Sequence, residues 1–157
     1  MLSNFVLKRR NIALYVFLLL LSSVSCEREK YEVVPYSYVN IYLQVSTDLA
    51  NWGQGIAAYI PRDDVGVNGI ILYRHMDDVY GNPQFFAYDG TCTYQPLDEN
   101  CKILLEEFET VGTCPCCSSS FIISADAVPT SGSKARLPLK QYGATLSNAG
   151  QTLHIHN

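Results

Sequence analysis

Beyond its first 35 residues, the chain is a series of short apolar stretches separated by turn residues. Residues 39–46 alternate apolar and polar for eight positions, which is the pattern of a strand with one buried face. Further strands are predicted at 56–60, 69–74, 84–88, 121–123, 139–146 and 151–156. Because no helical period extends over ten residues in this part, the pattern predicts an all-β domain over 36–157, an antiparallel sandwich or small barrel.

Two stretches between these strands are less regular. Residues 102–108 form a short amphipathic piece whose type the pattern leaves open, and 126–137 are expected to be a long polar loop. The last two strands are joined by 147–150, whose glycine suits the left-handed position of a hairpin loop.

The N-terminal segment has the organisation of an export signal. Lys8, Arg9 and Arg10 precede an unbroken apolar run of ten residues at 12–21, and small residues then lead to Cys26. Ten apolar residues are too few to cross a hydrocarbon core of about 30 Å, which needs about 20, so the run is interpreted as a signal-peptide core.

A cysteine after small residues resembles the lipobox of bacterial lipoproteins, in which the signal is removed before the cysteine and its sulfur carries a diacylglycerol. The resemblance implies a lipoprotein signal peptide at 1–25, a tether at 26–35 and lipidation of Cys26. The protein would then be held by this lipid on the extracytoplasmic side of a membrane of the cell envelope. Ordinary secretion, with Cys26 merely near the cleavage point, is the alternative.

Composition and charge restrict the function of the rest of the chain. Of 157 residues, 48% are hydrophobic and 17% charged, which is typical of a folded domain rather than a disordered chain. After the first 25 residues there are 8 basic and 15 acidic side chains. Because binding to phosphate backbones needs clustered Lys and Arg, a nucleic-acid partner is excluded.

Five cysteines lie within a stretch of 26 residues, which is too concentrated for a set of disulfides that stabilises the whole fold. In an oxidising compartment their default state is the disulfide, yet an odd number leaves at least one thiol unless a cluster or metal holds several. A local structure is therefore expected around Cys92, Cys101, Cys114, Cys116 and Cys117.

Residues 86–94 (FAYDGTCTY) and 114–121 (CPCCSSSF) resemble the two cluster-binding loops of Rieske iron–sulfur domains. That family has Cys-x-His in the first loop and Cys-x-x-His in the second, often as Cys-Pro-Cys-His-Gly-Ser-x-Phe. Residues 132–139 followed by Tyr142 are similar to the family's Gly-Pro-Ala segment and the strand after it. The resemblance covers about residues 35–157 and implies a Rieske-like fold with a 2Fe–2S cluster, an electron carrier and a redox partner protein in the envelope.

The chain departs from the family at both histidine positions. Cys92 and Cys114 match the two cysteine ligands, but the histidines are replaced by Tyr94 and Cys117. Cys116 matches the cysteine that in some members forms a disulfide with the first loop. The usual partner position is Leu97, which leaves Cys101 as the substitute.

Three hypotheses follow for the chemistry of the cysteines. In the first, Cys92, Cys114 and Cys117 bind a 2Fe–2S cluster with a fourth ligand from Cys101 or Tyr94. In the second, the cluster is lost and the cysteines form disulfides within a retained fold, giving a binding or structural module of the envelope without a cofactor. In the third, Cys92, Cys101, Cys114 and Cys117 bind zinc.

Other candidate residues have simpler explanations. His154 and His156 share one strand face and could bind a metal, but they are expected to be surface residues with Leu153 and Ile155 pointing inward. Four tyrosines, at 31, 36, 38 and 42, could form an aromatic binding face, but they are expected to pack within strands. No histidine and acid can be paired with the serines at 118–120, so no catalytic residues are assigned and the chain is at most an electron-transfer component.

Overall fold

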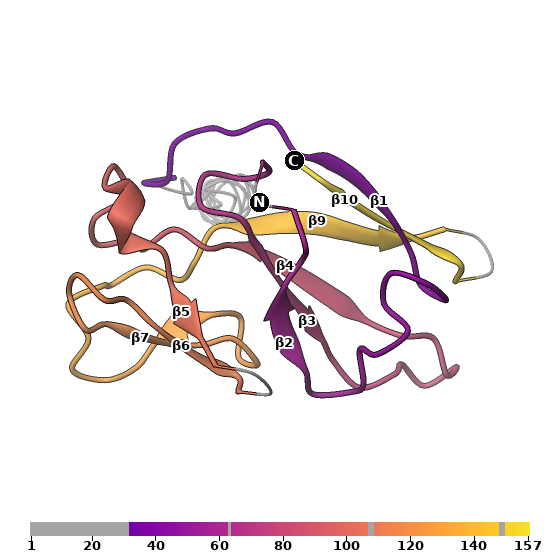
Figure 1. Ribbon diagram of the computed structural model, residues 1–157. Helices are drawn as coiled ribbons and strands as arrows, with labels where there is room; N and C mark the ends of the chain where they lie inside the picture. The colour runs from indigo at the N-terminus through magenta and orange to yellow at the C-terminus, as the bar shows by residue number, and fades with distance from the viewer. Residues whose placement is uncertain (1–31, 63, 107–108, 148–149) are drawn as a thin grey trace, which may run out of the picture. The chain divides into compact units, whose positions relative to one another are not determined.

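The larger of two antiparallel sheets contains six strands in the order β1-β10-β9-β4-β3-β2 (Figure 1). The computed structural model describes residues 32–62, 64–106, 109–147 and 150–157. The strands of this sheet are β1 (Asn40–Gln44), β2 (Ala57–Tyr59), β3 (Ile70–Arg74), β4 (Phe85–Asp89), β9 (Gln141–Leu146) and β10 (Thr152–His156). The first and last parts of the domain thus meet side by side, since β1 pairs with β10 from Asn40 opposite His156 to Gln44 opposite Thr152.

The smaller sheet has four short strands in the order β5-β6-β7-β8. They are β5 (Leu104–Leu105), β6 (Val111–Thr113), β7 (Ser120–Ile122) and β8 (Val128–Pro129), and the 3-10 helix η1 (Glu99–Cys101) precedes them. All of the cysteine-rich region lies in this sheet and in the loops around it.

Strand β3 is buried on both faces and separates two hydrophobic cores. Ile70 and Leu72 pack with residues of β1 and β10 in one core, whereas Ile71 and Tyr73 pack in the other. The second core also contains Phe121 of β7 and the cysteines Cys92, Cys101, Cys114 and Cys117. Because both cores share β3, which lies between β2 and β4, the cysteine region packs against an interior strand of the larger sheet.

The predicted all-β fold is confirmed, and six of the predicted strands appear within a residue or two of their expected limits at each end. The seventh, at 121–123, is shifted by one residue to β7 (Ser120–Ile122). The pattern missed β6 altogether, and β8 lies inside the segment expected to be a loop. Strands of two or three residues are too short to show an alternation, so periodicity could not find them.

Two surface expectations gave opposite results. Leu153 and Ile155 point inward while His154 and His156 lie on the opposite face, as predicted. The tyrosine prediction was wrong for residues 36, 38 and 42, which are 71%, 71% and 62% exposed. Tyr42 still has a contact there, because its ring stacks on that of His154 with centroids 4.3 Å apart.

The predicted signal peptide, Cys26, most of the tether and Tyr31 lie outside the described residues. Residues 32–157 form one compact unit. The part of the chain that the structure describes contains no helix that could span a membrane.

Candidate metal centre

The first cysteine loop leaves the end of β4 and is closed at its base by backbone hydrogen bonds. The N–H of Cys92 donates to the carbonyl of Cys101 at 3.3 Å, and the N–H of Ile103 donates to the carbonyl of Gly90 at 2.8 Å. Gly90 is required here, because a Cβ at this position would collide with the hydroxyl of Tyr59 and the carbonyl of Asn68. The sulfur of Cys92 is therefore fixed next to the strand and fully buried.

The second cysteine loop is the tight connection between β6 and β7. The N–H of Cys114 donates to the carbonyl of Ser119 at 2.8 Å, and the N–H of Ser118 donates to the carbonyl of Cys114 at 2.9 Å. Ser118 adopts a left-handed conformation, with φ of 57°, at the position where the Rieske pattern has glycine. This turn directs Cys114 and Cys117 into the protein, where they are 0% and 5% exposed.

The two loops bring three unpaired thiols together. The Sγ atoms of Cys92, Cys114 and Cys117 all lie within 4.8 Å of one another, and those of Cys92 and Cys117 are 3.6 Å apart. All three are buried, and they are the free cysteines of the described residues. Such a group of soft donors is typical of a thiolate site for iron–sulfur clusters or zinc.

Cys101 and Cys116 form a disulfide between the two loops. This is the pairing that the family resemblance implied. It also takes the sulfur of Cys101 out of the candidate ligand set, so of the two roles predicted for Cys101 the structure shows the disulfide. The four-cysteine zinc site would need this same sulfur and is incomplete without it.

The surroundings shift the thiol pKa values of Cys92 and Cys117 in opposite directions. Burial raises the pKa of the Cys92 thiol to about 12, although the backbone N–H groups of Tyr94 and Gln95 favour its thiolate. Burial also opposes ionisation of Cys117, but hydrogen bonds with the hydroxyl and the backbone N–H of Ser119 outweigh it and lower the pKa of this thiol. The surroundings of Cys117 therefore favour its thiolate, whereas Cys92 needs a nearby cation to ionise.

Ser119 connects the second loop to the segment at 132–139. Its Oγ lies 3.1 Å from the sulfur of Cys117 and accepts a hydrogen bond from the N–H of Ala135 at 2.9 Å. Because that oxygen accepts from Ala135, its own proton is available to a thiolate at Cys117. On the other side, the hydroxyl of Thr93 donates to the carbonyl of Leu137 at 2.8 Å, so this segment contacts both loops.

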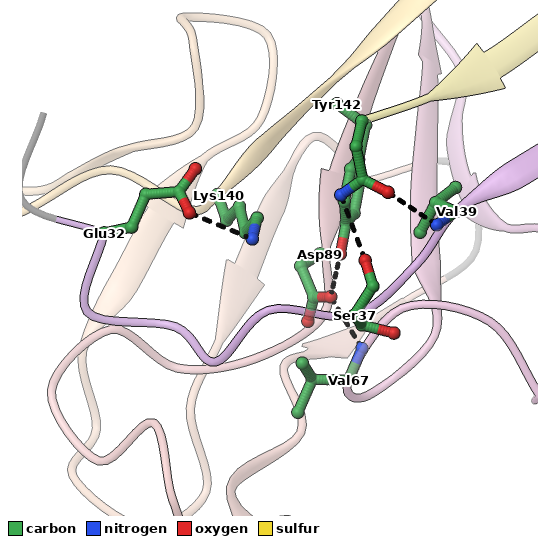
Figure 2. Close-up of polar contacts among 8 residues, drawn as sticks. Glu32, Ser37, Val39, Val67, Asp89, Lys140 and Tyr142 are labelled. Atoms are coloured by element: carbon green, nitrogen blue, oxygen red, sulfur yellow. Dashed lines mark hydrogen bonds and ion pairs between the residues drawn. The ribbon is translucent and has the colours of Figure 1, made fainter.

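A buried carboxylate supports the start of the first loop. Asp89 is 0% exposed and accepts hydrogen bonds from the N–H and hydroxyl of Thr91, the residue before Cys92. It also accepts from the N–H of Val67 at 2.8 Å and from the hydroxyl of Tyr142 at 2.7 Å (Figure 2). These bonds connect the loop to strand β9 and to the turn before β3.

The segment before β1 is fixed against the same region. Figure 2 shows Lys140 in an ion pair with Glu32, with Nζ and Oε2 3.3 Å apart. The side chain of Asn157 accepts a hydrogen bond from the N–H of Val39 at 2.6 Å and donates to the carbonyl of Ser37 at 3.0 Å.

Tyr94, the other substituted histidine position, lies at the surface of the first loop. Its side chain is half-exposed, and the ammonium of Lys134 lies 6.0 Å from its ring centroid. The predicted ligands Cys92, Cys114 and Cys117 are therefore brought together in the interior, while Tyr94 stays at its solvent side.

Three supporting residues had no role in the sequence interpretation: Asp89, Ser119 and the Ser133 hydroxyl that accepts from the N–H of Ser120. Asp89 and Ser119 lie inside the two motifs, which was the available signal. Their burial could not be read from a pattern, because a charged or hydroxyl side chain is usually exposed.

Comparisons with known proteins give weak structural similarities. No protein-family model matches the chain, and no curated protein matches it. Among solved structures, it is similar to a ferredoxin of Sphingomonas yanoikuyae B1, with a TM-score of 0.42 and 18% identity over 76% of this chain and 99% of that one. It is also similar to a chain in a complex of reduced oxygenase and oxidized ferredoxin in carbazole 1,9a-dioxygenase, with a TM-score of 0.42 and 20% identity over 74% and 93% of the two chains. At these values neither similarity carries an argument, so the interpretation rests on this chain's own residues.

Proposed function

We propose that this chain is a Rieske-like electron carrier of the cell envelope, whose cysteine site holds a 2Fe–2S cluster with altered ligation. The observation that carries the proposal is the convergence of three buried, unpaired thiols, Cys92, Cys114 and Cys117, from two loops. Two of these residues match the cysteine ligands of the Rieske pattern, and the third replaces one of its histidines.

The donor set fits an iron–sulfur cluster in chemical type. Such clusters are held by thiolates, and hydrogen bonds to the sulfurs help to set the potential. Backbone N–H groups of Tyr94 and Gln95 favour the thiolate of Cys92, and Ser119 does the same for Cys117. Since Cys101 is in the disulfide, Tyr94 is the remaining candidate for the fourth ligand. A phenol has a pKa of about 10, so iron itself would have to displace its proton.

The cluster would supply one-electron transfer at a low potential, about −400 mV for thiolate ligation against roughly −150 to +300 mV with two histidines. The chain's own residues exclude water from the thiols, stabilise negative charge on sulfur and hold the two loops together through the Cys101–Cys116 disulfide. A site of this kind needs no substrate pocket, and electrons would be exchanged with a redox partner protein.

The proposal includes export and lipid anchoring. A diacylglycerol on Cys26 would hold the protein at a bilayer surface outside the cytoplasm, with the part of the predicted 26–35 tether that precedes Glu32 as the link.

An optical spectrum with iron, sulfide and zinc analysis tests the function. The protein should be purified anaerobically and measured before and after iron–sulfur reconstitution. Visible charge-transfer bands with about two irons and two sulfides per chain are expected. A colourless protein without iron after reconstitution would refute the cluster, and stoichiometric zinc would replace it with the zinc hypothesis.

A second candidate function is a cluster-free binding or structural module of the envelope. The 3.6 Å separation of the Cys92 and Cys117 sulfurs favours it, because a second disulfide could form there with a small displacement. Counting thiols in the protein as isolated separates the two functions. A cluster protein has three ligand cysteines after the metal is removed under argon, whereas the module has one.

A further inference from the structure

The five cysteines of the domain form one continuous group of sulfur atoms. Cys92, Cys114 and Cys117 have their Sγ atoms within 4.8 Å of one another, and so do Cys101, Cys114 and Cys116. Cys114 belongs to both groups. Its free thiol therefore lies beside the disulfide on one side and beside the closely spaced Cys92 and Cys117 thiols on the other.

We propose that Cys114 is the nucleophile of an internal thiol–disulfide exchange that moves the Cys101–Cys116 disulfide to Cys92 and Cys117. Exchange proceeds by attack of a thiolate on a disulfide sulfur, which forms a new disulfide and releases the other sulfur as a thiol. No oxidant is consumed, because one disulfide and three thiols are present before and after each step.

The first step joins Cys114 to Cys101. The sulfur of Cys114 loses its proton and attacks the sulfur of Cys101, the Cys101–Cys116 bond breaks, and the sulfur of Cys116 leaves and takes up a proton. Cys116 is exposed, whereas Cys101 and Cys114 are fully buried. The leaving sulfur is thus the one that water can solvate.

The next two steps carry the bond to the other pair. Cys117 attacks the sulfur of Cys114 and releases Cys101, and Cys92, whose sulfur is 3.6 Å from that of Cys117, then attacks Cys117 and releases Cys114. Each attacking thiol loses one proton and each leaving sulfur gains one. The product has a buried Cys92–Cys117 disulfide and free thiols at Cys101, Cys114 and Cys116.

The position of the disulfide then determines whether a metal can bind, a consequence that rests on the proposed function. With the bond at Cys101–Cys116, all three candidate ligands are free. With the bond at Cys92–Cys117, two of them are lost. The exposed Cys116 is also the place where an external thiol can enter the series.

Disulfide mapping on the metal-free full-length protein tests the exchange. Protein carrying one disulfide is incubated under argon, quenched with an alkylating reagent at a series of times, and digested without reduction for mass spectrometry. A Cys92–Cys117 peptide with alkylated Cys101 and Cys116 is expected to accumulate while the number of thiols among the five domain cysteines stays at three. In Cys114→Ser it should form at least ten times more slowly.

Cys117→Ser is the matched control for this experiment. It keeps the first step, so disulfides of Cys114 with Cys101 should still appear, and a thermal unfolding transition close to that of the wild type shows that a serine in this loop leaves the fold intact. A wild-type protein that shows only Cys101–Cys116 at all times would overturn the proposal, as would unchanged formation of Cys92–Cys117 in Cys114→Ser. Iron loading is measured separately, so a failure of exchange leaves the cluster proposal intact, and a failure of loading leaves the exchange result valid.

Discussion

The hydroxyl of Tyr142 on β9 donates to the carboxylate of Asp89 at 2.7 Å, and Asp89 in turn accepts from the N–H of Thr91. Through Asp89, strand β9 of the larger sheet is thus connected to Thr91, the residue before Cys92. Because both groups are buried, this hydrogen bond supports the first cysteine loop from within the protein.

Replacing Tyr142 by Phe should lower the free energy of unfolding by about 1.5–3 kcal/mol, since a hydrogen bond to a buried charged group is lost. Chemical denaturation measures this. Tyr80→Phe is the control, because Tyr80 is 87% exposed and should change stability little. If Tyr142→Phe proves as stable as the wild type, Asp89 does not depend on this bond.

Stability should decrease at alkaline pH because of buried tyrosines. Burial raises the pKa of Tyr88 to about 12, and it also raises the pKa of Tyr59 and of Tyr142, both further increased by the nearby charge of Asp89. The unfolded chain ionises these phenols near pH 10, so their contribution is complete below pH 10 and is lost as the pH rises toward the folded pKa. Denaturation between pH 8 and 12 under argon should show a fall of up to about 1.4 kcal/mol per pH unit for each tyrosine. Unchanged stability up to pH 11 would contradict this.

Ser118→Gly should stabilise the protein by about 0.5–1 kcal/mol. Ser118 has a φ of 57°, a conformation that costs a residue with a Cβ about 1–2 kcal/mol, part of which the greater chain entropy of glycine offsets. Thermal unfolding measures the gain. Ser131→Gly is the control. Ser131 is an exposed serine just before the 132–139 segment, and its replacement should be neutral or slightly destabilising. A loss of stability in Ser118→Gly would show that its side chain matters more than its backbone.

Cys26→Ser should abolish lipid attachment if residues 1–26 are a lipoprotein signal. Expression in a bacterial host with radiolabelled palmitate should label the wild-type protein and leave the variant unlabelled and released from the membrane fraction. Cys116→Ser is a cysteine control that should remain labelled. Label that persists in Cys26→Ser would refute the anchor.

The sequence predicted the larger sheet well because its strands are long enough to alternate, as in β1 and β10. It also predicted that the cysteines would build one local structure. It could not assign them, since spacing alone left Cys101 both as ligand and as disulfide partner, and only the meeting of η1 with the second loop decided between the two. The short strand β6, which positions Cys114, had no readable pattern.

The prediction that the tyrosines are packed was wrong for a different reason. Strand propensity favours tyrosine on either face, whereas the alternation at 39–46 places Tyr42 on the polar face with Asn40 and Gln44, where the structure has it. In the same way Asp89 could only be recognised once the structure showed how many donors surround it, because a buried carboxylate is the exception for this residue type.

Iron loading of cysteine variants tests whether Cys92, Cys114 and Cys117 hold a cluster. Cys92→Ser, Cys114→Ser and Cys117→Ser are reconstituted beside the wild type and beside the double variant Cys101→Ser/Cys116→Ser, which removes the disulfide and leaves the three thiols in place. The wild type and the double variant should bind iron and sulfide with visible absorption, whereas each of the three single variants should lose most of both. Equal loading in the single variants, or no loading in the wild type, would contradict it.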